Sequence, residues 1–245
     1  MGYLCKNYIK MSNTKTILAS IVLLAGLLTP GGTAIRAQEL SSTALENYFT
    51  PSTSTAMSPD EDGFIRRWKL LEPISKPNPS NTVFTDSYIR ETFATEYFPG
   101  QFTVVPQDGD KVKIDRKTKL QWHALDSKLF NVKLFRFASN LKKDVYGVIF
   151  WAVTVIECPE EMTGVHMAVG SNSASMWWLN GEEAVILSGD RRMVMDDCVS
   201  GRLTLHKGRN IIRGAVINGP GMSDFCLRFI DSEGKPVKNI TVINE

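Results

Sequence analysis

The stretch that decides the fold is MWWLNGEEAV, residues 176–185. An apolar run that holds two of the chain's five tryptophans ends at Asn-Gly, and apolar residues resume after two glutamates. Asn-Gly between apolar runs favours a two-residue hairpin turn, because both turn residues need a positive φ. The sequence therefore predicts two antiparallel strands joined by a tight turn at residues 180–181.

The alternation of a strand separates the two tryptophans. Successive side chains point to opposite faces, so Trp177 and Leu179 share one face and Trp178 lies on the other. One of the two faces must belong to the core. The other tryptophan has two alternatives: its ring is a platform for a sugar, or residues 38–98 cover it.

Short apolar runs between polar breaks continue on both sides of this hairpin. VYGVIFWAVTVIEC (145–158) is long, β-branched and almost wholly apolar, as a central sandwich strand should be. FTVVP (102–106) and KLFRFA (133–138) are also predicted to be strands. About ten strands at spacings of roughly 8–12 residues indicate an all-β antiparallel sandwich. The exception is residues 81–98, where Phe84, Tyr88 and Phe93 recur at helical spacing and predict one helix.

The N-terminus has the pattern of a secretory signal peptide. Lys10 and Lys15 form a positive region before the apolar run TILASIVLLAGLL (16–28), and small residues offer cleavage after Ala34 or Ala37. An uncleaved anchor is the alternative, although the run is short for a span of about 20 residues. We expect a secreted or periplasmic protein that has no membrane segment after cleavage.

Composition divides the chain into three parts. We expect a signal peptide at 1–37, a Ser/Thr/Pro-rich spacer or arm at 38–62, and a β-sandwich domain at 63–245. This domain would consist of a front segment, 63–140, and a sandwich core, 141–245.

The charge and cysteine content exclude some classes of protein. Without residues 1–37 the chain carries 24 basic and 26 acidic residues, so no basic surface supports nucleic-acid binding. Cys158, Cys198 and Cys226 remain after the signal peptide. One pair of them could form a disulfide bond, but buried free thiols are commoner, and three cysteines do not make a disulfide scaffold.

Three motifs stand in order in the C-terminal half: Gly-Ser at 170–171, Trp-Trp-Leu-Asn-Gly at 177–181, and Leu-His-Lys-Gly-Arg-Asn at 205–210. Together they resemble the jelly-roll modules of the galactose-binding-like type, which accompany secreted glycoside hydrolases and carbohydrate esterases. The front half, from FIRRWKLLEPI (64–74) onward, is similar to the non-catalytic part of bacterial xylan-directed esterases. The resemblance implies a jelly roll with Trp177 and Leu179 in its core, and a non-catalytic role beside the degradation of xylan-type polysaccharide.

The resemblance also directs attention to a set of candidate glycan-binding residues. Arginine donates in a planar fork to hydroxyls and carboxylates, and an asparagine amide can donate to a sugar hydroxyl. The expected partners are a polysaccharide or oligosaccharide and a catalytic esterase or hydrolase domain. The candidate ligand-binding residues are Trp178, Trp122, Asp190, Arg191, Arg192 and Asn218.

Two other functions remain as alternatives, an esterase with an unrecognised site and a structural or protein-docking module. The Gly-x-Ser-x-Gly nucleophile elbow does not occur in the sequence, and GSNSAS (170–175) offers serines without its glycine frame. A catalytic triad is spatial, so Ser171, Ser173, Ser175 and the histidines, His123 first among them, remain to be tested against the structure. Because the nucleophile elbow is absent and the chain has only three histidines, we expect no catalytic residues.

No cofactor is predicted. The cysteines and histidines lack the paired spacing of a zinc site. Asp190, Asp196 and Asp197 could together hold a structural calcium ion, which needs several converging oxygens.

Overall fold

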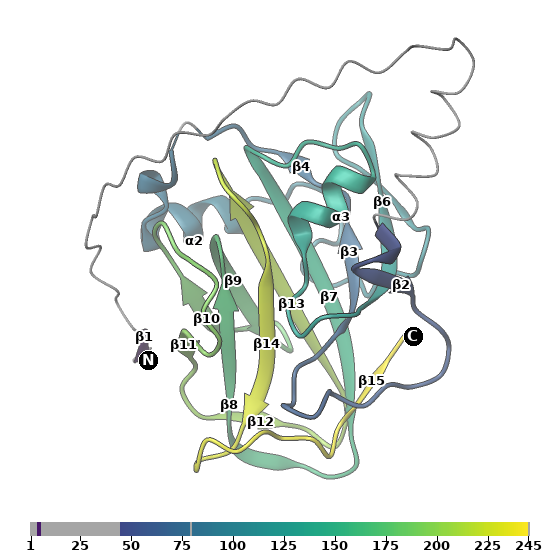
Figure 1. The fold of residues 1–245 in the computed structure, drawn as a ribbon, viewed down its shortest axis with the longest axis vertical. Coiled ribbons are helices and arrows are strands. Elements are labelled where there is room, and N and C mark those ends of the chain that lie inside the picture. Colours follow the sequence, from purple (N-terminus) through teal and green to yellow (C-terminus); the bar gives the residue numbers. More distant parts are fainter. Residues whose placement is uncertain (1–3, 6–44, 79, 245) are drawn as a thin grey trace, which may run out of the picture.

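The computed structural model describes residues 4–5, 45–78 and 80–244, and in them two antiparallel sheets pack face to face (Figure 1). The predicted all-β antiparallel sandwich is confirmed. The strands are β1 (Leu4–Cys5), β2 (Phe49–Pro51), β3 (Arg67–Leu71), β4 (Ile74–Ser75), β5 (Lys111–Lys113), β6 (Lys119–Ser127), β7 (Val148–Cys158), β8 (Met162–Ser171), β9 (Ala174–Leu179), β10 (Glu182–Leu187), β11 (Cys198–Val199), β12 (Leu203–Leu205), β13 (Gly208–Asn218), β14 (Phe225–Ile230) and β15 (Thr241–Ile243).

The larger sheet has ten strands in the order β10-β9-β13-β7-β3-β6-β2, with β4 and β15 also paired to β7 and β5 paired to β6. The smaller sheet has five strands in the order β1-β11-β8-β12, with β14 paired to β8. The long apolar run predicted to be a central strand is β7, which pairs with β13 along its whole length.

The predicted hairpin is confirmed. Leu179 pairs with Glu182, and the two residues between them, Asn180 and Gly181, have φ values of 52° and 90°. The Asn180 side chain also accepts a hydrogen bond from the Ile211 backbone N–H, at 2.8 Å. The turn is therefore tied to the neighbouring strand β13.

The main core lies between the two sheets. Trp177 is fully buried there, with its ring centroid 5.8 Å from that of Trp68 and 4.8 Å from that of Phe225. Its indole N–H donates to the Ser175 hydroxyl at 3.0 Å. Leu179 belongs to the same cluster. The inward direction of Trp177 and Leu179 is thus confirmed.

A second core lies on the other face of the ten-stranded sheet. Helix α2 (Asp86–Ala94) covers this face, and a short 3-10 helix, η1 (Asn81–Val83), precedes it. Trp178 stacks on Trp151 at 5.7 Å with an interplanar angle of 14°, and Phe93 of α2 meets its ring edge-on at 6.4 Å. Trp178 is half-buried, so the front segment covers much of its ring.

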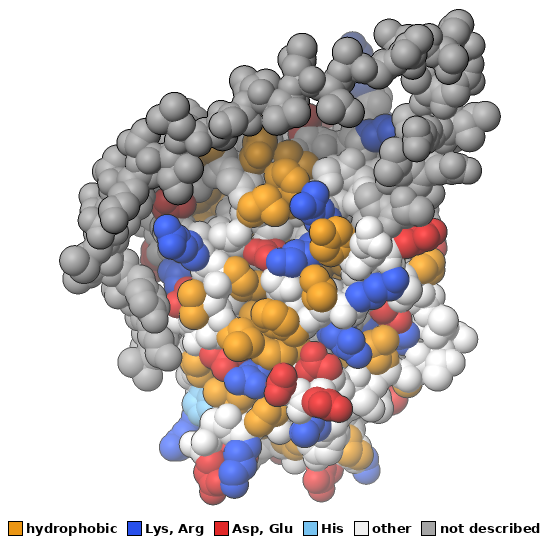
Figure 2. All heavy atoms as spheres, viewed as in Figure 1, with side chains coloured by type: hydrophobic (Ala, Val, Ile, Leu, Met, Phe, Trp, Pro, Cys, Tyr) orange, Lys and Arg blue, Asp and Glu red, His pale blue; other side chains and the backbone are white. Residues whose placement is uncertain are grey.

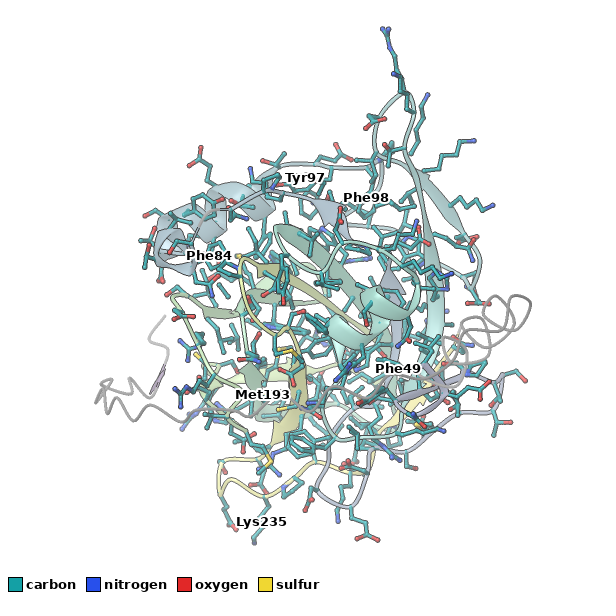
Figure 3. The ribbon with its side chains drawn as sticks, turned by 45° about the horizontal axis from the view of Figure 1, so that its top comes forward. Phe49, Phe84, Tyr97, Phe98, Met193 and Lys235 are labelled. Carbon is teal, nitrogen blue, oxygen red and sulfur yellow. The ribbon has the colours of Figure 1, made fainter. Side chains whose placement is uncertain are left out.

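The segments that flank α2 complete this second core. Phe84, Tyr97 and Phe98 lie on the side of the sheet that α2 covers (Figure 3). The Thr85 side chain caps the helix by accepting a hydrogen bond from the Tyr88 N–H. The helix therefore begins at Asp86 and not at residue 81. The prediction of a helix within 81–98 is confirmed, with narrower bounds.

Two strand predictions are wrong. KLFRFA falls in helix α3 (Leu134–Asn140), whose Leu134, Phe137 and Ala138 are buried at the i, i+3 and i+4 spacing of a helix. Residues 102–106 form no strand, because the Val104 N–H donates to the Gly100 carbonyl and closes a turn instead.

The described part of the predicted spacer is attached to the sandwich. β2 pairs with β6, and Met57 bridges to Val242. The buried Arg67 forms a bidentate ion pair with Asp126, at 2.8 and 2.9 Å, and Asp126 also accepts from Ser52. This network fixes residues 52–57 against the ten-stranded sheet.

The predicted signal peptide and residues 38–44 lie outside the described residues, apart from β1, which pairs with β11. Within the described ranges no helix is long and apolar enough to cross a membrane. Cys158 and Cys226 are buried free thiols, while Cys198 is disulfide-bonded, so no bond joins two of the three cysteines considered above.

Candidate functional site

One end of the sandwich gathers the loops that carry most of the predicted site residues. β7 begins at Val148, directly opposite the last residue of β13, Asn218. β9 begins and β10 ends at the same place, since Ser175 pairs with Leu187. We call the described loops that meet there, residues 76–78, 80–85, 131–133, 144–147, 172–173, 188–197 and 219–224, the loop end.

Asn81 joins two of these loops. Its side-chain amide donates at 3.0 Å both to the Asp190 carboxylate and to the Pro220 carbonyl. The Asn81 carboxamide oxygen would lie 2.3 Å from a Cβ placed on Gly219, so any larger residue there would displace the Asn81 side chain. The Asn81 side chain thus connects the predicted loop residue Asp190 to Pro220, which follows Asn218 by two residues.

The two predicted arginines differ. Arg191 forms an ion pair with Asp197 and donates to the Ser188 carbonyl at 3.0 Å, so it holds its own loop together. Arg192 is exposed. Only Arg192 therefore presents a guanidinium to solvent.

Asn218 is buried, with 1% of its surface exposed, and its side chain is used within the protein. The amide donates to the Val145 carbonyl at 2.6 Å and to the Gly221 carbonyl at 3.1 Å. Its oxygen accepts from the Ser173 hydroxyl at 3.3 Å. Asn218 therefore fixes the segment that carries Tyr146, and it has no free donor for a sugar.

The two predicted tryptophans lie elsewhere. Trp122 is 3% exposed and packs edge-on against Phe98 at 6.1 Å, so it has no open ring face. Trp178 faces the layer beneath α2. Neither of these rings lies at the loop end.

A partly exposed aromatic surface begins at the loop end, and the sequence analysis missed it. Tyr146 and Arg136 are exposed there, while Phe135 and Tyr48 are half-buried. The rings of Phe135 and Tyr146 are 5.9 Å apart, and the Arg136 guanidinium lies 5.9 Å from the Phe135 ring and 5.5 Å from the Tyr48 ring. We call Tyr48, Arg136, Phe135 and Tyr146 the aromatic strip. Tyr146 is 56% exposed, the largest fraction among the exposed large apolar residues of the described chain.

The local sequence explains how the strip is presented. Leu134, Phe137 and Ala138 anchor α3 in the core, which turns Phe135 and Arg136 outward. The Phe135 N–H donates to the Ser223 carbonyl at 2.9 Å, which fixes the start of the helix against β14. The part of the strip that Phe135 and Arg136 form is thus carried by a helix fixed to the core.

Tyr146 is held from both sides. Asn218 binds the carbonyl of the preceding residue, and Gly147 follows with φ 60° and accepts from the Lys76 N–H at 2.7 Å. A Cβ on Gly147 would lie 3.0 Å from the Pro77 Cα, so the turn depends on glycine. An aromatic side chain is therefore exposed between two residues whose carbonyls are both hydrogen-bonded.

Hydrophobic side chains gather at the end of the molecule where α3 lies (Figure 2). Met222 is 44% exposed and directly precedes Ser223, to which Phe135 is bonded. Close by, the buried Asp224 accepts from Asn131 at 2.9 Å and from Lys133 at 2.7 Å, while its second oxygen has no partner in the described part of the chain. The surface thus combines apolar rings with a polar cluster.

The residues considered for catalysis do not form a triad. Ser171 donates to the Ser173 carbonyl at 2.6 Å. His166 faces the Ser200 carbonyl, and His123 and His206 each face a glutamate. Among the residues that the structure describes, no hydrogen bond joins a hydroxyl of Ser171, Ser173 or Ser175 to a histidine ring.

The predicted calcium ligands do not converge. Asp190 is bonded to Asn81, Asp196 is paired with Arg228, and Asp197 is paired with Arg191. Across residues 45–78 and 80–244, no group of three or more His, Cys, Asp or Glu side chains is placed to hold a metal ion.

The opposite end of the sandwich has a shallow hollow of about 430 Å³. It contains no aromatic side chain, and its one thiol, Cys158, is buried, which raises the pKa of that thiol. The hollow is lined by Glu157, Cys158, Pro159, Lys207, Gly208, Asn239 and Thr241. It offers no surface comparable to the aromatic strip.

Comparison with known proteins gives structural likenesses of low similarity. No protein-family model matches the chain, and no curated protein does. A PA14 sugar-binding domain from an RTX adhesin aligns with a TM-score of 0.42 and 10% identity, over 74% of this chain and 100% of that domain. A β-glucuronidase from Ruminococcus gnavus aligns with a TM-score of 0.38 and 12% identity, over 79% of this chain and 41% of that one.

A β-glucosidase from Kluyveromyces marxianus aligns with a TM-score of 0.36 and 14% identity, over 77% of this chain and 19% of that one. This chain therefore spans less than half the length of either glycosidase. The resemblance to xylan-directed esterases stays a prediction.

Proposed function

We propose that this protein is a non-catalytic, glycan-binding β-sandwich that binds through the aromatic strip. The observation that carries the proposal is the exposure of Tyr146, 56%, next to the Phe135 ring at 5.9 Å. Aromatic rings that stay exposed on a rigid support mark binding surfaces, because burial would otherwise stabilise the fold. A sugar offers an apolar C–H face for such a ring and hydroxyls for the groups around it.

The form of the strip suits an extended ligand. Tyr48, Phe135 and Tyr146 come from three separate segments, and successive groups along the strip are 5.5 to 5.9 Å apart. Stacking on several rings in a row tolerates variation along a chain-like ligand, since each ring contributes on its own. An oligosaccharide of several units fits this arrangement better than a single sugar.

We propose a secreted protein that binds xylan-type polysaccharide beside the enzymes that degrade it. The support is the N-terminal signal pattern, with its apolar run at 16–28, and the resemblance of residues 145–240 to modules of such enzymes.

A titration with xylo-oligosaccharides and other soluble glycans tests the proposal. Tyr146→Ala should weaken binding about tenfold or more, since loss of one stacking ring costs about 1–2 kcal/mol. Phe102→Ala is the matched control, because Phe102 is also exposed, at 40%, but lies against Trp151 beneath the other face. Binding by no glycan, together with release of acetate or ferulate from xylan, would instead favour an esterase.

A further inference from the structure

Arg136 differs from the other cations around the strip. Lys133 is paired with Asp224 at 2.7 Å, and Lys143 is paired with Glu72 at 3.1 Å. Arg136 is exposed, and in the described part of the chain its guanidinium meets only two aromatic rings and no carboxylate. It is therefore a cation at the centre of the proposed binding surface whose charge no anion of the described chain neutralises.

The two rings also restrict the guanidinium. It lies 5.5 Å from the centroid of Tyr48 and 5.9 Å from that of Phe135, within the range of cation–π attraction. Such contacts are electrostatic and do not use the N–H groups as hydrogen-bond donors to a carboxylate. A planar fork of N–H donors held in this way matches a carboxylate in a bidentate pair.

The charges nearby do not cancel this preference. Lys142 and Asp144, both exposed, lie in the segment between α3 and Tyr146 and balance one another. The carboxylate of Asp224 is buried and engaged by Lys133. Beside Tyr48, the exposed Glu46 and Lys128 also carry opposite charges, and the Lys128 ammonium donates to the Glu46 carbonyl. These opposite charges cancel in number, and the charge of Arg136 is left over.

We propose that the strip recognises an acidic sugar, a uronic acid residue whose carboxylate pairs with Arg136 while neighbouring sugars stack on Phe135 and Tyr146. This inference rests on the proposed glycan binding and adds the class of ligand. A sugar that stacks beside the pair would exclude water from it and strengthen the charge-assisted hydrogen bonds relative to those in open water.

The test compares xylo-oligosaccharides of equal length with and without one glucuronic acid branch, by calorimetric titration at low salt. Wild-type protein should bind the branched ligand about tenfold more tightly, as one charge-assisted pair allows. Arg136→Gln should reduce the ratio of the two affinities to near one. Arg202→Gln, an exposed arginine before β12, is the control and should keep the wild-type ratio.

The outcomes separate this inference from the proposed function. Equal binding of both ligands by wild-type protein would overturn the preference for acidic sugars and leave glycan binding standing. Binding of neither ligand would contradict both. A sulfated xylo-oligosaccharide serves as a further arm: if it binds as tightly as the uronate ligand, the carboxylate pairing is wrong and the attraction is one of charge alone.

Discussion

Gly214 of β13 lies directly opposite Trp177 of β9, and the Trp177 indole fills the space that a side chain at residue 214 would need. A Cβ on Gly214 would lie 2.2 Å from Cζ3 of the indole. The φ of Gly214 is not positive, so the reason for glycine here is space and not backbone conformation. The main core thus depends on the pairing of a tryptophan on one strand with a glycine on the next.

Gly214→Ala should lower the free energy of unfolding by about 1–3 kcal/mol, because the added methyl group overpacks a rigid core. Urea unfolding followed by tryptophan fluorescence measures the change. In a Trp177→Leu protein, which lacks the indole ring, Gly214→Ala should lower the free energy of unfolding much less. Equal costs of Gly214→Ala in both backgrounds would show that the two residues do not share this space.

Cys226 should make stability depend on pH in the alkaline range. Burial raises the pKa of its thiol from 9.0 to about 12, so the folded state keeps a proton that the unfolded state loses. The resulting stabilisation is complete below pH 9 and is lost as the pH rises from about 9 toward 12. Between pH 8 and pH 10.5, as rough limits, wild-type protein should lose more stability than Cys226→Ala.

The comparison with Cys226→Ala removes the contributions of lysine and tyrosine, which titrate in the same range in both proteins. Parallel stability curves for the two proteins would mean that the thiol ionises as easily in the folded state as in the unfolded state. Iodoacetamide labelling of the native protein gives a second reading, since a buried, protonated thiol should react slowly.

Asn218 should act on glycan binding through Tyr146. Its amide holds the Val145 carbonyl at 2.6 Å, and its removal frees the segment that presents the ring. Asn218→Ala should cost about 1–3 kcal/mol of stability, because buried polar partners lose their bonds, and should also weaken glycan binding. Tyr146→Phe is the control for loss of the hydroxyl alone. Undiminished binding by a folded Asn218→Ala protein would show that the amide does not position the strip.

Much of the fold could be predicted from the sequence because the signals are local. Asn180-Gly181 fixed the hairpin, and strand alternation separated Trp177 from Trp178. The strand prediction for 133–138 failed because Leu134, Phe137 and Ala138 suit a helix as well as a strand in so short a run. Only packing against the core distinguishes the two.

The candidate site was much harder to predict. Asp190, Arg191, Arg192 and Asn218 do lie at the loop end, but only Asp190 and Arg192 are exposed there. The aromatic strip unites Tyr48, residues 135–136 and Tyr146, whose contact depends on how three distant segments pack. The one local signal for the aromatic strip was Tyr146, which precedes Gly147 after a polar stretch.

We propose that glycan binds at Tyr146 and not at Trp178. The most direct measurement is the affinity of one xylo-oligosaccharide for Tyr146→Ala and Trp178→Ala, taken together with their melting temperatures. We expect Tyr146→Ala to keep the wild-type melting temperature and to bind at least about tenfold more weakly. Trp178→Ala should lose about 2–4 kcal/mol of stability, since it leaves a gap against Trp151 and Phe93, and should retain its affinity. Loss of binding in Trp178→Ala with full binding in Tyr146→Ala would contradict the claim.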